Sequence, residues 1–332
     1  MYKCLIIGGG SMGKRRIRCL AANDVKAGQM RLVDLRADRR DEVLKKHQVA
    51  GFERIEDGLA WDPDLVLVSV PGAYHLPACL AALEAGKHVF CEVPLSTSLE
   101  GIDRLVPLAT GKQLVVAPGC DWAFHPLNQQ VKRWLDDPAF GKPLFCHEMQ
   151  GSYLPDWHPY EDYRSFYGSD RAMGGGNLDM IAQELTLLYW LTGDRMRHVY
   201  CQGNKLSELE INASDYHQIV ANGKNGLALT MQFDLISRIH KYDIRIVSEQ
   251  GTIELGSTSA RRYLAETGAW DEMTLDEDFD YEPCYVSEIR TLLACVRGET
   301  TWPLPLECAI DVVRFLVAIE RSDAADAPVE VV

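Results

Sequence analysis

Residues 3–13 read Lys-Cys-Leu-Ile-Ile-Gly-Gly-Gly-Ser-Met-Gly, and this stretch decides the fold of the 332-residue chain. A short apolar run ends at Gly8, and Gly8, Gly10 and Gly13 match the spacing G-x-G-x-x-G at the start of a helix predicted over 12–21. In that setting Gly8 permits a tight turn, Gly10 lets the backbone approach a pyrophosphate, and Gly13 lets the helix pack closely on the strand. The pyrophosphate then lies at the helix N-terminus, so the stretch predicts a dinucleotide site.

Short apolar runs and helical patterns alternate over the first third of the chain. The runs are 3–8, 30–34, 65–70, 88–91 and 113–117, and the helical patterns are 12–21, 39–47, 76–85 and 99–108. This alternation is typical of a doubly wound parallel sheet. It predicts an α/β Rossmann domain over 1–122.

The pattern changes after this point. A helix is expected over 126–135, and strands over 144–153, 196–204, 215–221, 227–235, 242–248 and 252–255. Short turns such as 222–226 join some of these strands and indicate hairpins. We therefore expect a second domain over 123–332, of the α+β class with a largely antiparallel sheet, that ends in a helix over 307–320 and a loosely held tail over 324–328.

Composition excludes several classes of function. The formal net charge of −14 and the pI of about 5.1 disfavour nucleic acid and anionic membranes as partners. Ten cysteines occur without a C-x-x-C pair, and no spacing suggests a metal site. A buried strand so near the first residue leaves no room for a signal peptide, and no apolar run reaches membrane-spanning length. We expect a cytoplasmic protein.

Asp34 closes the second apolar run, about twenty residues beyond the glycine turn. A carboxylate at this place accepts hydrogen bonds from the adenosine ribose hydroxyls, which favours NAD. Arg36, Arg39 and Arg40 follow closely and can neutralise a 2′-phosphate, although such a run also suits a solvated helix face. NADP is therefore the open alternative.

Three further segments, 70–75 (VPGAYH), 85–94 (AGKHVFCEVP) and 174–179 (GGGNLD), follow the glycine turn in order. Together they resemble the Gfo/Idh/MocA oxidoreductase family, and GKRRIR, SLEGIDRL and YLPDWHPYEDYR resemble a branch linked to bacterial sugar and nonulosonic-acid pathways. The motif and the resemblance together assign the following residues to the cofactor: Gly8, Gly10, Ser11, Met12, Gly13, Asp34, Leu35, Arg36, Val70, Pro71, His75, Glu92, Val93 and Pro94.

The chain departs from the family pattern at its catalytic positions. The family's Glu-Lys-Pro lysine is Val93 here, and its Asp-x-x-x-His-x-x-Asp helix carries Asp179, Gln183 and Thr186 on one face. An arginine that the family often places before Phe-His-Pro is Ala123. Because Gln183 cannot accept a proton near neutral pH, another group must take the hydroxyl proton.

A loop expected over 153–164 carries the replacement candidates. His158 is a candidate proton acceptor, Tyr153 and Tyr163 are candidate phenolic donors, and Arg164 is a candidate clamp for phosphate or carboxylate. The alternative is that the aromatic residues pack the loop while the charges face water. Asp179 and Gln183 complete the candidate catalytic set, and the expected substrate contacts are Val93, Asp121, Trp157, Arg164, Asp179 and Gln183. Two histidines next to or near prolines, His75 and His125, and Glu184, which points away from the Asp179 face, are weaker catalytic candidates.

The resemblance implies an NAD(P)-dependent oxidoreductase acting on a small molecule such as a sugar, sugar nucleotide or related polyol. Two alternatives stay open: an enzyme that uses bound NAD transiently for epimerisation or elimination, and a non-catalytic homologue that binds NAD or sugar. The resemblance also implies a homo-oligomer, a dimer or tetramer. We expect the second subunit to cover an open sheet face that carries Met231, Phe233 and Ile244.

Overall fold

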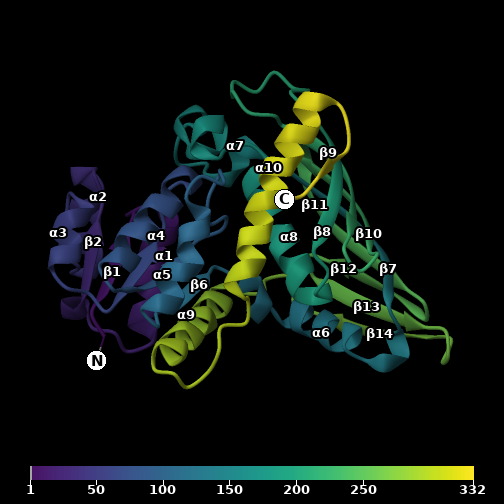
Figure 1. The fold of residues 1–332 in the computed structure, drawn as a ribbon, viewed down its shortest axis with the longest axis horizontal. Helices are drawn as coiled ribbons and strands as arrows, with labels where there is room; N and C mark the ends of the chain where they lie inside the picture. Colours follow the sequence, from purple (N-terminus) through teal and green to yellow (C-terminus); the bar gives the residue numbers. More distant parts are fainter. Residues whose placement is uncertain (1) are drawn as a thin grey trace. The chain divides into compact units, whose positions relative to one another are not determined.

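The computed structural model describes residues 2–332 (Figure 1). Its first unit is built on a six-stranded sheet with the order β3-β2-β1-β4-β5-β6. All neighbouring strands of this sheet are parallel. The strands are β1 (Cys4–Ile7), β2 (Met30–Val33), β3 (Gly51–Phe52), β4 (Leu65–Val68), β5 (His88–Cys91) and β6 (Val116–Pro118). The helices are α1 (Ser11–Ala22), α2 (Ala37–His47), α3 (Ile55–Ala60), α4 (His75–Glu84) and α5 (Leu105–Gly111), with α9 (Glu282–Val296) added from late in the chain.

The predicted Rossmann architecture is confirmed, and the reason lies in the apolar runs. Every residue of β1 and β4 is buried, as expected for parallel strands covered on both faces. The sheet order places the change of winding direction between β1 and β4, where dinucleotides bind in such folds. The glycine turn therefore lies at the carboxyl ends of the parallel strands, where folds of this type bind a dinucleotide.

The first unit ends at Asp121 but also takes in Tyr281–Ile310. Helix α9 packs against α1, and Glu282 at its start pairs with Arg15 and Arg18 of α1. The expected second domain of 123–332 included this segment. The structure corrects that boundary, because the core of the first unit contains Ile289, Leu292 and Leu293.

The second unit comprises Trp122–Asp280 and Asp311–Val332 and holds a nine-stranded sheet with the order β14-β13-β12-β11-β7-β10-β9-β8-β15. Its strands are β7 (Pro143–Tyr153), β8 (Met196–Asn204), β9 (Tyr216–Gly223), β10 (Ala228–Asp234), β11 (Ile236–Ser248), β12 (Gly251–Gly256), β13 (Ser259–Leu264), β14 (Ala269–Thr274) and β15 (Val329–Glu330). Its helices are α6 (Pro126–Leu135), α7 (Leu154–Trp157), α8 (Leu178–Thr192) and most of α10 (Leu306–Ala325).

This sheet is largely antiparallel, as predicted, and the turn at 222–226 joins the hairpin of β9 and β10. Strands β7 and β10 pair in parallel, which makes the sheet mixed. The tail expected over 324–328 differs from the expectation, because residues 324 and 325 belong to α10 and Ala327 forms hydrogen bonds with Ser322. Strand β15 follows and pairs with β8.

The sheet face that carries Met231, Phe233 and Ile244 is covered within the chain. These three side chains are at most 3% exposed. Tyr242, on the same face, donates a hydrogen bond to Glu184 of α8, so a helix of the same chain lies over it. The expectation that another subunit covers these residues was wrong; the opposite face of the sheet is the open one.

Candidate functional site

In the turn after β1, neighbouring backbone atoms leave no room for a side chain at Gly8 or Gly13, but there is room at Gly10. A Cβ added at Gly13 would lie 1.8 Å from the Gly8 carbonyl oxygen, and one added at Gly8 (φ +102°) would lie 2.3 Å from the Ser69 carbonyl oxygen. A Cβ at Gly10 would come no nearer than 3.9 Å to a guanidinium nitrogen of Arg39. The backbone is therefore accessible at Gly10, where a pyrophosphate must approach.

Helix α1 begins immediately after this turn and has an uncapped N-terminus. Gly10 is its N-cap residue, without a side-chain hydrogen bond, and the first turn carries no acidic residue. The amides of exposed Ser11 and half-buried Met12 are thus suited to an anion. These residues fit the pyrophosphate of a nicotinamide dinucleotide, which supplies a hydride acceptor when bound.

Asp34 lies beside the turn, at the end of β2. Its Oδ2 accepts the Gly9 amide at 2.7 Å, and its Oδ1 accepts the Arg36 amide at 2.8 Å. Leu35, the next residue, is 79% exposed. The carboxylate and the exposed apolar side chain fit an adenosine ribose and its base.

His75, which the sequence analysis assigned to the cofactor, is buried and lies against two backbone carbonyl oxygens. The imidazole is 2% exposed, and its nitrogens lie 2.6 Å from the carbonyl oxygens of Val70 and Pro94. Burial lowers the pKa of His75, which favours the neutral ring. The buried ring lies between the segments that follow β4 and β5, and a neutral ring donates to one of the two carbonyl oxygens. Val70, Pro71 and Val93 are half-buried and therefore more exposed than His75; a contact of His75 with the cofactor stays a prediction.

Glu92 follows β5 and is paired with an arginine from α1. Arg16 donates from Nε to Oε1 at 2.7 Å and from Nη2 to Oε2 at 3.0 Å. The third guanidinium nitrogen of Arg16 donates to Glu288 of α9 at 2.6 Å, and Arg16 and Glu288 are fully buried. Glu92 keeps 15% of its side chain exposed, so Arg16 holds this carboxylate at the cofactor edge of the sheet.

Asp121, a predicted substrate contact, closes the first unit. Its Oδ2 accepts the hydroxyl of Tyr281 at 2.9 Å. Burial raises the pKa of Asp121, while the charge of Arg16 opposes the rise.

In the second unit, Asp179 lies in the first turn of α8 and forms the most chemically distinctive contact of the predicted set. The hydroxyl of Tyr167 donates to its Oδ2 at 2.5 Å. Burial raises the pKa of Asp179 to about 6, and the Tyr167 hydrogen bond acts in the opposite direction. A carboxylate with this pKa is mostly ionised at neutral pH and can accept a proton.

The other two positions of the helix pattern differ in burial. Gln183 is exposed one turn beyond Asp179, whereas Thr186 is 1% exposed and donates to the Ala182 carbonyl oxygen at 2.5 Å. Only Asp179 and Gln183 are accessible to a substrate.

The segment predicted as a loop contains the short helix α7 and an aromatic cluster. Trp157 donates to Ser152 at 2.9 Å, and the His158 ring contacts the Phe166 ring with centroids 4.3 Å apart. His158 Nδ1 lies 2.6 Å from Glu161, which positions the imidazole.

Arg164 and Tyr163 both contact Glu210, which lies in the loop between β8 and β9. Arg164 pairs with Asp162 and Glu210, and half of its side chain is exposed. The Tyr163 hydroxyl accepts the Glu210 amide at 3.2 Å. Tyr153 lies under the guanidinium of Arg238, 3.7 Å from its ring centroid. The structure thus joins Trp157 and His158 through Phe166, whereas Tyr153, Tyr163 and Arg164 contact other residues.

A buried carboxyl pair lies under α8. Glu148 of β7 is 1% exposed, and burial together with the nearby Glu184 raises its pKa well above the usual range. Glu184 accepts the Tyr242 hydroxyl at 3.2 Å. The pair occupies the covered sheet face, away from the half-buried Asp179 and the exposed Gln183.

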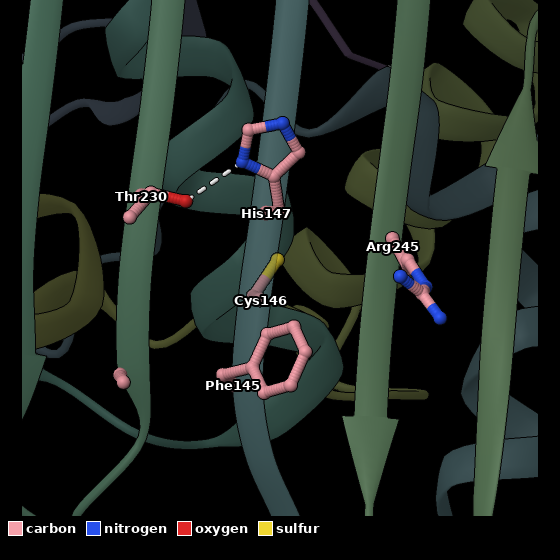
Figure 2. Close-up of a pocket in the computed structure, with 6 residues that line it drawn as sticks. Phe145, Cys146, His147, Thr230 and Arg245 are labelled. Carbon is pink, nitrogen blue, oxygen red and sulfur yellow. Dashed lines mark hydrogen bonds between the residues drawn. The ribbon is translucent and has the colours of Figure 1, made fainter.

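A hollow in the second unit lies on the opposite face of the sheet (Figure 2). It measures about 540 Å³, and its lining includes Phe145, His147, Thr230 and Arg245 from strands β7, β10 and β11. His147 Nδ1 lies 2.7 Å from Thr230 Oγ1. None of the predicted catalytic residues lines this hollow.

Sequence reasoning missed Tyr167 and Arg16. Tyr167 lies in a glycine-rich stretch with no periodic signal, and only the folded path of the segment brings it to Asp179. Arg16 follows Gly13 on the helix face that packs inward, so a charged residue at that spacing was a detectable sign of a buried ion pair.

Comparisons with known proteins agree with this geometry. The model described as "Oxidoreductase family, NAD-binding Rossmann fold" matches residues 2–120, and the "GFO/IDH/MocA C-terminal domain" model matches residues 128–254. An inositol 2-dehydrogenase/D-chiro-inositol 3-dehydrogenase of Shouchella clausii is 28% identical, with 87% of this chain and 82% of that protein covered. A myo-inositol 2-dehydrogenase of Thermotoga maritima is 25% identical over 87% of this chain and 88% of its own.

Solved structures share the fold. The WlbA dehydrogenase from Bordetella pertussis, in complex with NADH and UDP-GlcNAcA, has a TM-score of 0.82 and 18% identity and covers 99% of this chain and 98% of its own. An oxidoreductase domain protein from Kribbella flavida has a TM-score of 0.87 and 18% identity, with 100% of this chain and 99% of its own covered. Within residues 2–332, no helix is long and apolar enough to cross a membrane.

Proposed function

Because the chain belongs to the Gfo/Idh/MocA oxidoreductase family, we propose that it oxidises a hydroxyl group of a polyol, sugar or sugar nucleotide with NAD as hydride acceptor. Support for the substrate class comes from the inositol dehydrogenases among its relatives and from a structural neighbour that holds a sugar nucleotide. The glycine turn and Asp34 support the cofactor.

One observation carries the chemistry: a carboxyl group with a raised pKa occupies the accessible start of α8. Asp179 receives the substrate hydroxyl proton, and Tyr167 orients its carboxylate through the hydrogen bond to Oδ2. Gln183, exposed one turn later, orients the substrate by hydrogen bonding. Glu92, held by Arg16, keeps a fixed negative charge at the cofactor edge.

The test measures NADH absorbance while purified protein is given NAD with myo-inositol or with UDP-linked hexoses. We expect stoichiometric NADH formation with one of these classes and a loss of roughly 10²–10⁴-fold in kcat for Asp179→Asn, since a positioned proton acceptor contributes about that much. The matched control is Asp156→Asn, an exposed acid in the same unit.

The other readings predict different results. Product formation without NADH accumulation indicates transient use of NAD in epimerisation or elimination. Binding without product indicates a non-catalytic homologue. If His158→Ala abolishes turnover while Asp179→Asn is fully active, the proton acceptor is in the 153–164 segment instead.

The chain is also proposed to form a homo-oligomer in the cytoplasm. The open sheet face supports the oligomer, because Phe145 and Val220 expose 39% and 46% of their surface there. A second copy that packs on this face removes that apolar surface from water.

A further inference from the structure

Four aromatic side chains between α7 and α8 contact one another in a row that starts at Asp179. Tyr167 donates its hydroxyl to Asp179, and its ring centroid lies 4.4 Å from that of Phe166. The Phe166 centroid lies 4.3 Å from that of His158, which in turn lies 5.2 Å from that of Tyr160. This aromatic row of Tyr167, Phe166, His158 and Tyr160 therefore connects the proposed proton acceptor with a distant aromatic ring.

The far end of the aromatic row is open to a ligand. Tyr160 is 73% exposed, whereas the other three residues of the row are half-buried. The ring planes of His158 and Tyr160 are 19° apart, so the two rings stack. A planar heterocycle can extend such a stack, and every nucleobase has a face suited to it. Because three side chains lie between Asp179 and Tyr160 in the row, a substrate that contacts both needs a second group beyond its reacting ring.

The row is held in place by contacts within the second unit. The Phe166 ring also contacts the Trp157 ring, with centroids 6.4 Å apart, and Trp157 donates to Ser152. A Cβ added at Gly168 would lie 2.7 Å from the Phe166 ring, so the glycine leaves the space that this ring occupies. Aromatic side chains that are already ordered lose little conformational entropy when a ligand binds.

The acidic residues of this segment are paired, which reduces their repulsion of an anionic ligand. Glu161 lies 2.6 Å from Nδ1 of His158, and Asp162 lies 3.2 Å from Nη1 of Arg164. The guanidinium of Arg164 also pairs with Glu210. Arg164, the expected clamp for a phosphate, therefore has two carboxylates of its own chain as partners.

Arg238 is a cation without such partners. It lies in the irregular stretch of β11 between Ile236 and Lys241 and is exposed. Its guanidinium lies 3.7 Å from the ring centroid of Tyr153, the residue that precedes α7. Within residues 2–332 no carboxylate forms an ion pair with Arg238. A guanidinium in this state can form charge-assisted hydrogen bonds with a phosphate.

We propose that the second unit binds the nucleoside diphosphate part of a sugar nucleotide, with the base stacked on Tyr160 and a phosphate at Arg238. The sugar then lies at Asp179. The inference rests on the proposed function and names its substrate class, because a free polyol or sugar has neither a planar base nor a phosphate and leaves both features unused.

The experiment measures the dissociation constant of UDP by calorimetry on protein saturated with NADH, so that the dinucleotide site is occupied. Tyr160→Ala should weaken UDP binding by at least about fivefold, the lower end of what stacking of one base contributes. Tyr160→Phe keeps the ring and should retain the affinity. Arg238→Gln should weaken UDP by at least about tenfold, as expected for a hydrogen bond between charged groups. Added salt should weaken UDP less in Arg238→Gln than in the wild type.

Matched controls come from another exposed pair of an arginine and an aromatic ring in the same unit. The guanidinium of Arg261 lies 4.5 Å from the ring centroid of Trp270, which is 47% exposed. Trp270→Ala and Arg261→Gln should leave the dissociation constant of UDP unchanged. A loss of affinity in these variants as large as in Tyr160→Ala and Arg238→Gln would overturn the assignment of the site.

The remaining outcomes separate this inference from the proposed function. The inference is overturned if UDP does not bind the NADH-loaded protein, or if Tyr160→Ala binds UDP as tightly as the wild type. If myo-inositol is oxidised and UDP does not inhibit the reaction, the proposed function stands and the inference is overturned. If UDP binds as expected but no sugar nucleotide or polyol is oxidised, the proposed function fails and the nucleotide site stands.

Discussion

At the scale of single residues, Asp179 is a half-buried carboxylate in the first turn of α8. An aspartate in water has a pKa near 3.9 and is a weak base, so its environment decides its use. Burial raises the pKa of Asp179 to about 6, and the Tyr167 hydrogen bond limits this rise by stabilising the ionised carboxylate. The proposed function uses this carboxylate as the proton acceptor.

The pH dependence of kcat follows from this shift. Since protonated Asp179 cannot accept a proton, activity should fall as the pH drops below about 6 and should be level above it. Tyr167→Phe removes the hydrogen bond that lowers the pKa, so the midpoint of the fall should move to higher pH. The measurement is kcat between pH 4.5 and 8.5 for both proteins. An unchanged midpoint in Tyr167→Phe would show that another group controls the profile.

The geometry of the glycine turn and the position of Asp34 were predictable because they depend on local spacing. Gly8, Gly10, Gly13 and Asp34 follow one another along a strand, a turn and a helix, and short-range geometry is sufficient to place them. The contact of Asp179 with Tyr167 depends on the path of an irregular segment, for which the sequence has no periodic signal. The role of the loop residues was the weakest part of the prediction for the same reason.

At the scale of elements, the alternating apolar runs predicted the parallel sheet but not its smallest members. Strand β3 has two residues and helix α3 has six, too few for a periodic pattern. Helix α9 was missed for another reason: its partner α1 is separated from it by more than 250 residues, and only long-range contacts such as that of Glu282 with Arg18 reveal the pairing.

The pairing of α1 with α9 gives a prediction about stability. Arg16→Met removes the cation between two carboxylates and leaves buried Glu288 without its ion partner, which should cost roughly 3–5 kcal/mol in the free energy of unfolding. Arg18→Met, on the same helix, removes a 46% exposed arginine and should cost less than about 1 kcal/mol. Urea denaturation followed by circular dichroism measures both. Equal midpoints for Arg16→Met and the wild type would contradict the stabilising role of the buried pair.

At the scale of the whole molecule, the nine-stranded sheet has one face covered by its own chain and one open face. Met231 and Phe233 lie on the covered face, while Val220 and Phe145 lie on the open one. Both faces carry apolar side chains, so alternation along the strands showed that two faces exist but not which of them the helices occupy. Contacts of α8 with the sheet decide this.

An oligomer formed through the open face is sensitive to a charge placed there. Phe145→Glu should shift the molar mass in solution toward that of the monomer, since a carboxylate buried in an apolar interface loses its hydration. Leu206→Glu changes a 59% exposed leucine outside the strands and should have no effect. Light scattering after size-exclusion chromatography measures the mass. A wild-type monomer, or an unchanged mass in Phe145→Glu, would exclude this interface.

The return of Tyr281–Ile310 to the first unit has a consequence for the order in which the protein is made. Arg16 leaves the ribosome early, but its partner Glu288 is 272 residues away and emerges only when most of the chain has been translated. Until then the inward face of α1 has no α9 to cover it, and a buried cation lacks one of its two carboxylates. The dinucleotide-binding fold therefore cannot be completed co-translationally from its amino end, although its signature lies there. Until residues 281–310 have been translated, the surface of α1 that α9 covers is exposed to solvent.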